Sequence, residues 1–135
     1  MQNGKSHSLG KDERLKSRKG INSLFESGKK ITLFPYRLLY QIEKGTGTIQ
    51  AGFTVSSKHF PRAVDRNRIK RLSREAYRLQ NTALKVAIPA NHKRLQLFFV
   101  YTGREILSHE EISVLIKKML DKLVRIIYEE GITNT

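Results

Sequence analysis

The strongest chemical signal in the sequence is a run of basic residues between Ala63 and Arg78. At about 100° per residue on a helix, one face collects the apolar side chains of Ile69, Leu72, Ala76 and Leu79. The opposite face collects Asn67, Lys70, Arg71, Arg74 and Arg78. A guanidinium group binds phosphate oxygens with two N–H groups and stays charged. Arginines one turn apart, about 5.4 Å, approximate the phosphate spacing of a nucleic-acid strand, so this pattern predicts a phosphate-binding helix.

This helix is predicted over residues 65–79, with Asp65 as its N-cap. Capping by Asp65 leaves Arg66 and Arg68 free to project from the first turn, where backbone N–H groups also favour a phosphate. The simpler interpretation is a solvated basic face, since charged runs often serve only solubility. Few acidic residues interrupt the basic face, which favours a polyanionic partner, but charge alone does not separate RNA from DNA.

The overall charge agrees with that interpretation. The chain has 135 residues, with 26 Lys and Arg against 12 Asp and Glu, a net charge of +14 and a pI near 10.3. Self-repulsion of this size destabilises a compact fold and is typical of a protein with a polyanionic partner. Nucleic acid is the first candidate, and an anionic membrane surface is the second.

Several other classes are excluded. The chain has no cysteine, which excludes disulfides, thiolate nucleophiles and cysteine-ligated metals. It has no apolar run of the ~20 residues that span a bilayer, and residues 1–19 lack the apolar segment of a secretory signal. We therefore expect a soluble, cytoplasmic protein, with a mobile basic arm over residues 1–14 and one domain over residues 15–131.

Two further helices are predicted. The first lies between Ser17, an N-cap, and Gly28, expected in the left-handed conformation that ends a helix. The last begins with a capping box of Ser108 and Glu111 and ends at Gly131. Its apolar stripe, expected to pack on the core, consists of Ile112, Leu115, Ile116, Met119, Leu123, Ile126 and Ile127.

Strands are predicted over residues 36–42, 50–56 and 95–101. The glycine-rich turn at 45–47 indicates that the first two form a hairpin. Residues 80–94 contain a proline and mixed polarity and are expected to form a linker. The order helix, strand, strand, helix, strand, helix predicts an α+β domain with a small mixed sheet.

The basic helix also carries a family signature. The run Arg66, Asn67, Arg68, Ile69, Lys70, Arg71 and Leu72, followed by Arg74 and Glu75, resembles the motif of the bacterial ribonuclease P protein family. The resemblance extends to residues 14–16, to Leu24, Phe25 and Gly28, and to residues 51–58 and 63–64. Together these segments span roughly Arg14 to Leu123, and the long motif is specific.

The resemblance implies a small basic subunit of an endoribonuclease that removes the 5′ leader from precursor tRNA. In that family the RNA subunit performs the hydrolysis with Mg²⁺, and the protein acts as a cofactor. The implied fold resembles the second domain of ribosomal protein S5, with a left-handed crossover around the motif helix. The implied partners are the RNA subunit and precursor tRNA.

 The protein is expected to be a monomer, with one copy for each RNA subunit, and no membrane partner is expected.

The predicted site residues fall into two groups. The resemblance implies them except for Arg78, which shares the basic helix face, and Tyr36, Arg37 and Tyr40, which are added because they lie on the neighbouring strand. The catalytic-RNA-binding group consists of Arg66, Asn67, Arg68, Lys70, Arg71, Arg74 and Arg78. The group that binds the leader of precursor tRNA consists of Phe25, Tyr36, Arg37, Tyr40 and Lys58. Single-stranded RNA is held by stacking on aromatic rings together with cations, which suits these residue types. Tyr36 and Tyr40 share one strand face and Arg37 lies on the other, so alternation leaves open which face lines the cleft.

Two departures from the family pattern affect the leader path. Ile21 occupies a position where the family usually has a second phenylalanine, one turn before Phe25. The loop before the motif helix, His59, Phe60, Pro61 and Arg62, is one residue longer than usual.

The protein itself is expected to contribute no catalytic residue and to hold no tightly bound metal or organic cofactor. Its histidines are scattered along the chain without a metal-ligand spacing. A structural or ribosomal RNA-binding protein without associated catalysis remains the alternative. A DNA-binding regulator is disfavoured because the residues before the basic helix resemble a strand rather than the first helix of a helix-turn-helix.

Overall fold

A four-stranded mixed sheet forms the centre of the protein. The computed structural model describes residues 13–133, with side chains described to residue 129. The strands are β1 (Lys29–Leu33), β2 (Tyr36–Lys44), β3 (Ile49–Val55) and β4 (Lys93–Tyr101). The helices are α1 (Arg18–Ser27), α2 (Ala63–Gln80), α3 (Thr82–Ala90) and α4 (His109–Thr133). The predicted α+β class and mixed sheet are confirmed.

The strand order is β1-β2-β4-β3, so the predicted hairpin of residues 36–42 and 50–56 is wrong. β4 lies between β2 and β3, antiparallel to β2 and parallel to β3. The turn at 45–47 instead passes around the start of β4, where Gly47 N donates to Lys93 O at 2.9 Å. The hairpin partner of β2 is β1, a strand not expected from the sequence.

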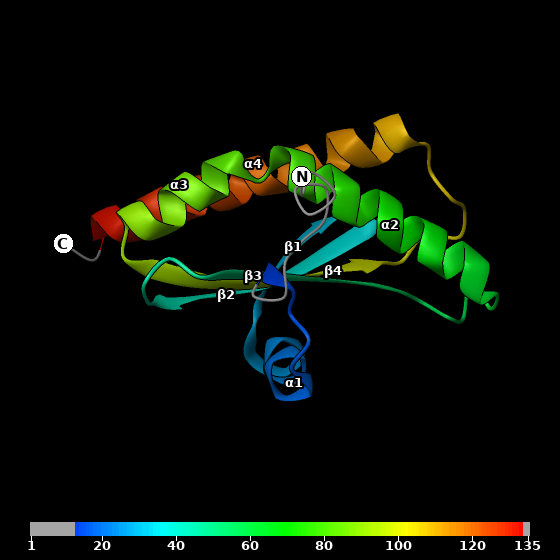
Figure 1. Ribbon diagram of the computed structural model, residues 1–135, viewed down its shortest axis with the longest axis horizontal. Coiled ribbons are helices and arrows are strands. Elements are labelled where there is room, and N and C mark those ends of the chain that lie inside the picture. Colours follow the sequence, from blue (N-terminus) through cyan, green and yellow to red (C-terminus); the bar gives the residue numbers. More distant parts are fainter. Residues whose placement is uncertain (1–12, 134–135) are drawn as a thin grey trace, which may run out of the picture.

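The helices cover the two faces of the sheet unequally (Figure 1). α2, α3 and α4 lie together on one face, whereas α1 lies alone on the other and crosses the strands. The main core fills the space under the three helices and includes Leu38, Leu97, Phe99, Ile69 and Ile116. A smaller cluster of Leu15, Leu24, Leu39 and Phe98 attaches α1 to the opposite face.

Helix α1 begins as predicted and ends differently. The Ser17 side chain accepts a hydrogen bond from Gly20 N at 3.1 Å, which confirms the N-cap. Gly28 has φ −70° and ψ 156°, so the chain leaves the helix in an extended conformation rather than the predicted left-handed one. A Cβ atom at Gly28 would lie 2.6 Å from Leu24 O, which explains the glycine by close backbone approach.

Helix α2 begins two residues before the predicted N-cap. Asp65 lies inside the first turn, and its carboxylate accepts from Arg62 Nε at 2.9 Å rather than capping the helix. The core face is also rotated from the predicted one, since Leu79 is 58% exposed while Ser73 and Tyr77 are buried. The Tyr77 ring packs edge to face against Phe99, and that aromatic contact sets the rotation of the helix.

Residues 80–94 were expected to be a linker, but helix α3 occupies most of them. Leu84, Ala87 and Ile88 have the i, i+3, i+4 spacing of a helix face and are buried in the main core. Pro89 stands in the last turn of the helix, so its ring interrupts few backbone hydrogen bonds. Apolar burial therefore outweighs the helix-breaking tendency of this proline.

Helix α4 confirms its predicted start and its apolar stripe. Glu111 N donates to Ser108 Oγ at 3.1 Å, and Ser108 N donates to Glu111 Oε1 at 3.0 Å, which completes the capping box. The helix continues past the predicted end at Gly131 to Thr133. The stripe packs on the core as expected, with Ile112, Ile116, Met119, Leu123 and Ile127 buried and Leu115 and Ile126 partly buried.

The predicted arm over residues 1–14 lies outside the described residues except for Glu13 and Arg14. Arg14 forms a parallel β-bridge with Ala51, and Leu15 N donates to Ala51 O at 2.9 Å. Glu13 Oε2 lies 3.4 Å from Lys85 Nζ on α3. The chain just before α1 is therefore attached to the edge strand β3 and passes close to the helical layer.

Candidate nucleic-acid interface

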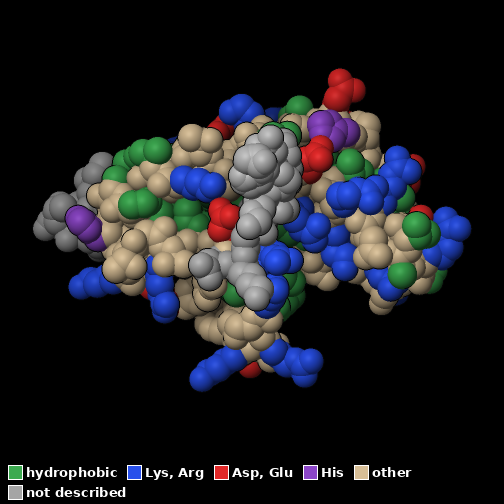
Figure 2. All heavy atoms as spheres, viewed as in Figure 1, with side chains coloured by type: hydrophobic (Ala, Val, Ile, Leu, Met, Phe, Trp, Pro, Cys, Tyr) green, Lys and Arg blue, Asp and Glu red, His purple; other side chains and the backbone are tan. Residues whose placement is uncertain are grey.

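The basic residues of α2 lie on the side of the helix that faces away from the core. Ile69, Ser73, Ala76 and Tyr77 are buried on the inner side. The outer side carries Asn67, Lys70, Arg71, Arg74 and Arg78, of which Asn67 and Arg71 are exposed and the others half-buried. Figure 2 shows Lys and Arg side chains gathered over α2 and at the tip that α1 forms. We call this outer side of α2, together with Arg66 and Arg68, the basic stripe.

Several cations of the basic stripe are available to an external anion. Arg68 and Arg71 are exposed, and Lys70 is half-buried. Among the described residues, no acidic side chain forms an ion pair with any of these three. The nearby acid Glu75 is directed instead to His109, with Oε1 and Nε2 3.4 Å apart. An unpaired cation keeps its full attraction for phosphate, which suits this surface to RNA.

Arg66 has a structural contact that the sequence pattern did not predict. Its Nη1 atom donates to Phe60 O at 2.8 Å and to Pro61 O at 2.7 Å, so it fastens the loop between β3 and α2. A guanidinium group has five N–H donors, which leaves others for an external partner. Arg66 therefore holds the loop in position and still presents charge at the start of the helix.

A groove connects the basic stripe to the sheet face that carries α1. Its volume is about 260 Å³, and its lining includes Arg14, Lys16, Ile21, Thr54 and Arg74. The Arg74 guanidinium carbon also lies 5.9 Å from the centre of the Phe53 ring, a cation–π contact that holds the side chain at this position. Because Arg74 also belongs to the basic stripe, this groove and the basic stripe meet at this residue.

The surface next to this groove is formed by α1 and the sheet beneath it. Ile21 and Phe25 lie one turn apart on the same side of the helix. Phe25 is 52% exposed, and its ring contacts the buried Phe98 ring edge to face, with centres 5.8 Å apart. The sheet beside them carries Val100, which packs against the α1 cluster, and its direct neighbours Arg37 and Thr54. We call this surface, together with the groove that reaches Arg74, the leader groove, after the partner predicted for it from the sequence.

Close packing of α1 on the sheet requires a glycine in β3. A Cβ atom at Gly52 would lie 2.5 Å from the Phe98 ring and 3.3 Å from Leu15 O. The absence of a side chain at Gly52 thus lets the Phe98 ring lie across β3, where it supports Phe25. The sequence shows a glycine in this strand, but only the structure shows that the Phe98 ring occupies the space beside Gly52.

The structure shows which face of β2 lies on the α1 side. Arg37 is exposed on the α1 side, on the same face as Leu39 of the α1 cluster. Tyr36 and Tyr40 lie on the other face and are only 1% and 5% exposed, so they are inaccessible to a stacked base. Their inclusion in the predicted leader-binding group is therefore wrong. Lys58 is exposed in the loop after β3, beyond the end of that strand.

The buried tyrosines have structural roles. The Tyr36 hydroxyl is hydrogen-bonded to Ser73 Oγ, and Ser73 Oγ also donates to Ile69 O at 2.8 Å. Burial raises the pKa of the Tyr36 and Tyr77 phenols above their ordinary value. Both therefore stay neutral at physiological pH and connect α2 to the core instead of acting on a ligand.

Several residues of the leader groove were not predicted from the sequence, and the reason can be identified for each of them. Phe98 and Val100 alternate with residues of the main core along β4 and lie on the α1 face of that strand. Arg14 and Lys16 precede α1 and line the groove only because the chain pairs with β3. Period-two alternation along β4 could have grouped Phe98 with Val100, but it could not have placed α1 over them.

Two negative findings concern residues 13–133. No group of three or more His, Asp or Glu in this part of the chain is arranged to hold a metal ion. No helix in it has both the length and the apolar character needed to cross a membrane.

The chain is similar over most of its length to proteins of known family. A family model described as Ribonuclease P matches residues 9–126. The ribonuclease P protein component of Porphyromonas gingivalis is 30% identical over 128 residues, which cover 93% of each chain. That of Chlorobaculum tepidum is 33% identical over 131 residues, covering 89% of this chain and 85% of the relative.

Solved structures support the same fold. The RNase P protein of Staphylococcus aureus superposes with a TM-score of 0.65 at 17% identity, over 84% of this chain and 96% of that one. The RNase P protein of Thermotoga maritima gives a TM-score of 0.65 at 23% identity, over 82% and 96% of the two chains. Together with the family match, these findings disfavour a ribosomal or purely structural RNA-binding protein. The chain belongs to the ribonuclease P protein family, whose members work with the RNA subunit of this endoribonuclease in tRNA 5′ processing.

Proposed function

We propose that this protein uses two adjoining surfaces to hold the catalytic RNA and the 5′ leader of precursor tRNA together. The basic stripe of α2 binds the RNA subunit, and the leader groove beside α1 binds the single-stranded leader. The observation that carries this proposal is the shared groove, in which Arg74 of the stripe lies with Ile21 and Thr54 of the α1 side. The RNA subunit and the leader bound at these surfaces lie next to each other, so the catalytic RNA is held beside the leader that it removes.

The chemistry of each surface suits its proposed partner. On the basic stripe Arg66, Arg68, Lys70, Arg71, Arg74 and Arg78 contact phosphates, and Asn67 supplies an amide for further hydrogen bonds. In the leader groove the half-exposed ring of Phe25 offers a face for a base, and Arg37 offers a cation beside it. Lys58 adds a further exposed cation at the end of β3.

The chemical step belongs to the RNA subunit in this proposal. Mg²⁺ bound by that RNA supplies the activated water for hydrolysis, and the protein contributes binding and orientation. The protein carries no catalytic residue and no tightly bound cofactor of its own. It acts as a monomer, one per RNA, in the cytoplasm.

Phe25→Leu is expected to weaken binding of precursor tRNA without affecting mature tRNA. A stacked base contributes about 1–3 kcal/mol, so the holoenzyme should lose roughly 5- to 150-fold in affinity for leader-bearing substrate only. Equilibrium binding of both tRNAs to the reconstituted holoenzyme measures the difference.

The matched control is Phe34→Leu, because Phe34 is 74% exposed in the turn between β1 and β2, outside the leader groove. This variant should bind both tRNAs as the wild type does. Equal losses for precursor and mature tRNA in Phe25→Leu would show that the ring does not contact the leader.

A further inference from the structure

A second group of cations lies on α4, outside both surfaces described above. Lys118, Lys122 and Arg125 are exposed at positions i, i+4 and i+7 of the helix, so they share one side of it. They line a groove of about 350 Å³ between α4 and β1, and β1 contributes Thr32 and Leu33. We call this the edge groove.

The positive charges of the edge groove are not neutralised by acidic side chains. Within the described part of the chain, none of the three forms an ion pair. Asp121 is the acid in the lining, and its Oδ2 atom accepts from Lys117 Nζ at 3.1 Å. Since Lys117 already offsets Asp121, the groove carries net positive charge and favours an anionic ligand.

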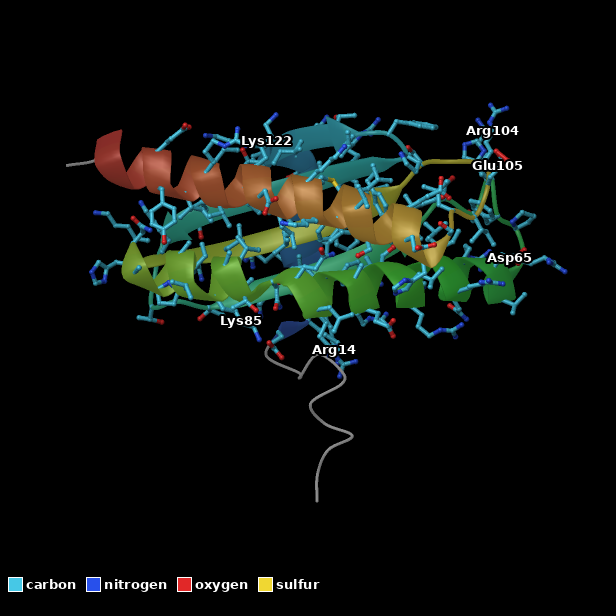
Figure 3. The ribbon with its side chains drawn as sticks, turned by 90° about the horizontal axis from the view of Figure 1, so that it is seen from above. Arg14, Asp65, Lys85, Arg104, Glu105 and Lys122 are labelled. Carbon is cyan, nitrogen blue, oxygen red and sulfur yellow. The ribbon has the colours of Figure 1, made fainter. Side chains whose placement is uncertain are left out.

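The edge groove is separate from the basic stripe. β1 and β3 are the opposite edges of the sheet, with α4 beside β1 and α2 beside β3. Viewed from above the helices, Lys122 lies on the opposite long side of the molecule from Arg14 and Lys85 (Figure 3). An RNA duplex seated on α2 therefore does not account for these cations.

The leader groove leads directly to the edge groove. Thr54, Val100, Arg37 and Thr32 are successive direct neighbours across β3, β4, β2 and β1. Alternation puts all four on the α1 face, because Val100 packs against α1 while Ile31 belongs to the main core. The row spans about 14 Å, three inter-strand spacings. It ends at Thr32, which also lines the edge groove.

We propose that the edge groove binds the backbone phosphates of leader nucleotides that lie upstream of those in the leader groove. This inference rests on the proposed function, because it takes the leader to lie along the row beside α1. The cleavage site lies with the catalytic RNA at the α2 side, so the strand runs from β3 toward β1. Nucleotides farther from the cleavage site then pass the β1 edge and meet Lys118, Lys122 and Arg125.

Contacts between these cations and leader phosphates can be recognised in binding measurements. Lysine and arginine on backbone phosphates bind without regard to base sequence and respond strongly to salt. Their contribution appears only when the leader is long enough to pass the edge of the sheet. The affinity gained by lengthening the leader therefore measures the edge groove directly.

The test compares precursor tRNAs with leaders of about 3 and about 12 nucleotides, a range typical of single-strand sites. Their binding to the reconstituted holoenzyme is measured with wild-type protein and with the triple variant Lys118→Gln, Lys122→Gln and Arg125→Gln. The variant should bind the long-leader substrate roughly tenfold more weakly, and the salt slope should fall by about 2, or ~0.7 per lost phosphate contact. Binding of the short-leader substrate should not change.

A matched triple variant controls for the loss of charge. Lys44→Gln, Lys85→Gln and Arg104→Gln remove three exposed cations that line neither groove. The affinity of the holoenzyme for both substrates should stay close to that of the wild type, with at most a small and equal loss for the two. Circular dichroism of each variant verifies that the fold is kept.

The other outcomes separate this inference from the proposed function. An equal loss for short and long leaders in the Lys118, Lys122 and Arg125 variant would overturn the inference, because the groove would then contact the RNA subunit or the tRNA body. No loss for either substrate would also overturn it. A wild-type holoenzyme that does not distinguish precursor from mature tRNA would contradict the proposed function itself.

Discussion

Phe99→Ala should lower the free energy of unfolding by about 3–5 kcal/mol, the range for removing a large buried aromatic side chain. Phe99 is 1% exposed at the centre of β4. Its ring stacks on Phe53 with centres 5.2 Å apart and meets Tyr36 and Tyr77 edge to face at 6.3 and 6.0 Å. Truncation leaves a cavity where β3, β2 and α2 converge, and total stabilities of such domains are only about 5–15 kcal/mol.

Denaturant unfolding followed by circular dichroism measures this change, with Phe34→Ala as the matched control. Phe34 is 74% exposed, so its truncation should change the free energy of unfolding by no more than about 0.5 kcal/mol. Similar effects from the two substitutions would contradict the burial of Phe99 and with it the position of α2 over β3.

The second large effect is expected at the basic stripe. The double variant Arg68→Ala and Arg71→Ala removes two exposed guanidinium groups that no described acid neutralises. Binding to the RNA subunit should weaken about tenfold, and the salt slope should fall by about 1.4–1.8, or ~0.7–0.9 per lost phosphate contact. Filter binding or fluorescence titration over a range of salt concentrations gives both quantities.

Lys85→Ala with Arg104→Ala is the control, because it removes two exposed positive charges outside the stripe. This control should leave the salt slope close to that of the wild type. If the Arg68 and Arg71 variant kept an unchanged slope, those side chains would not contact phosphate.

Local features of the fold were predictable because neighbouring residues determine them. Ser108 and Glu111 form the predicted capping box, and Ser17 caps α1, because both patterns depend on residues three positions apart. The basic stripe was predictable for the same reason, since helical period alone separates Arg71 from Ile69.

Features that depend on distant partners were not predictable in this way. Alternation showed that Tyr36 and Arg37 face opposite ways, but only the position of α1 shows that Arg37 is on the groove side. The false hairpin has the same cause, because a turn at 45–47 does not reveal that β4 inserts between β2 and β3. Helix α3 was missed because Pro89 and Asn91 suggested a loop, whereas burial of Leu84 and Ile88 stabilises a helix.

Side-chain burial also changed which aromatic residues belong to the candidate site. The tyrosines of β2 have the residue type expected for base stacking, and residue type alone cannot show that they lie in the core. Phe98 shows the converse, because it supports the exposed ring of Phe25 from within an apolar run that gave no functional signal. Candidate RNA-binding aromatics therefore need a structure before they can be assigned.

The central claim is that this protein assists a catalytic RNA rather than cleaving RNA itself. The most direct test is cleavage of precursor tRNA by the cognate ribonuclease P RNA at low, near-physiological Mg²⁺, with and without the protein. Strong stimulation of leader removal, together with no cleavage by the protein alone, is the predicted result. Tight RNA binding without stimulation would contradict the account and indicate a purely structural RNA-binding protein.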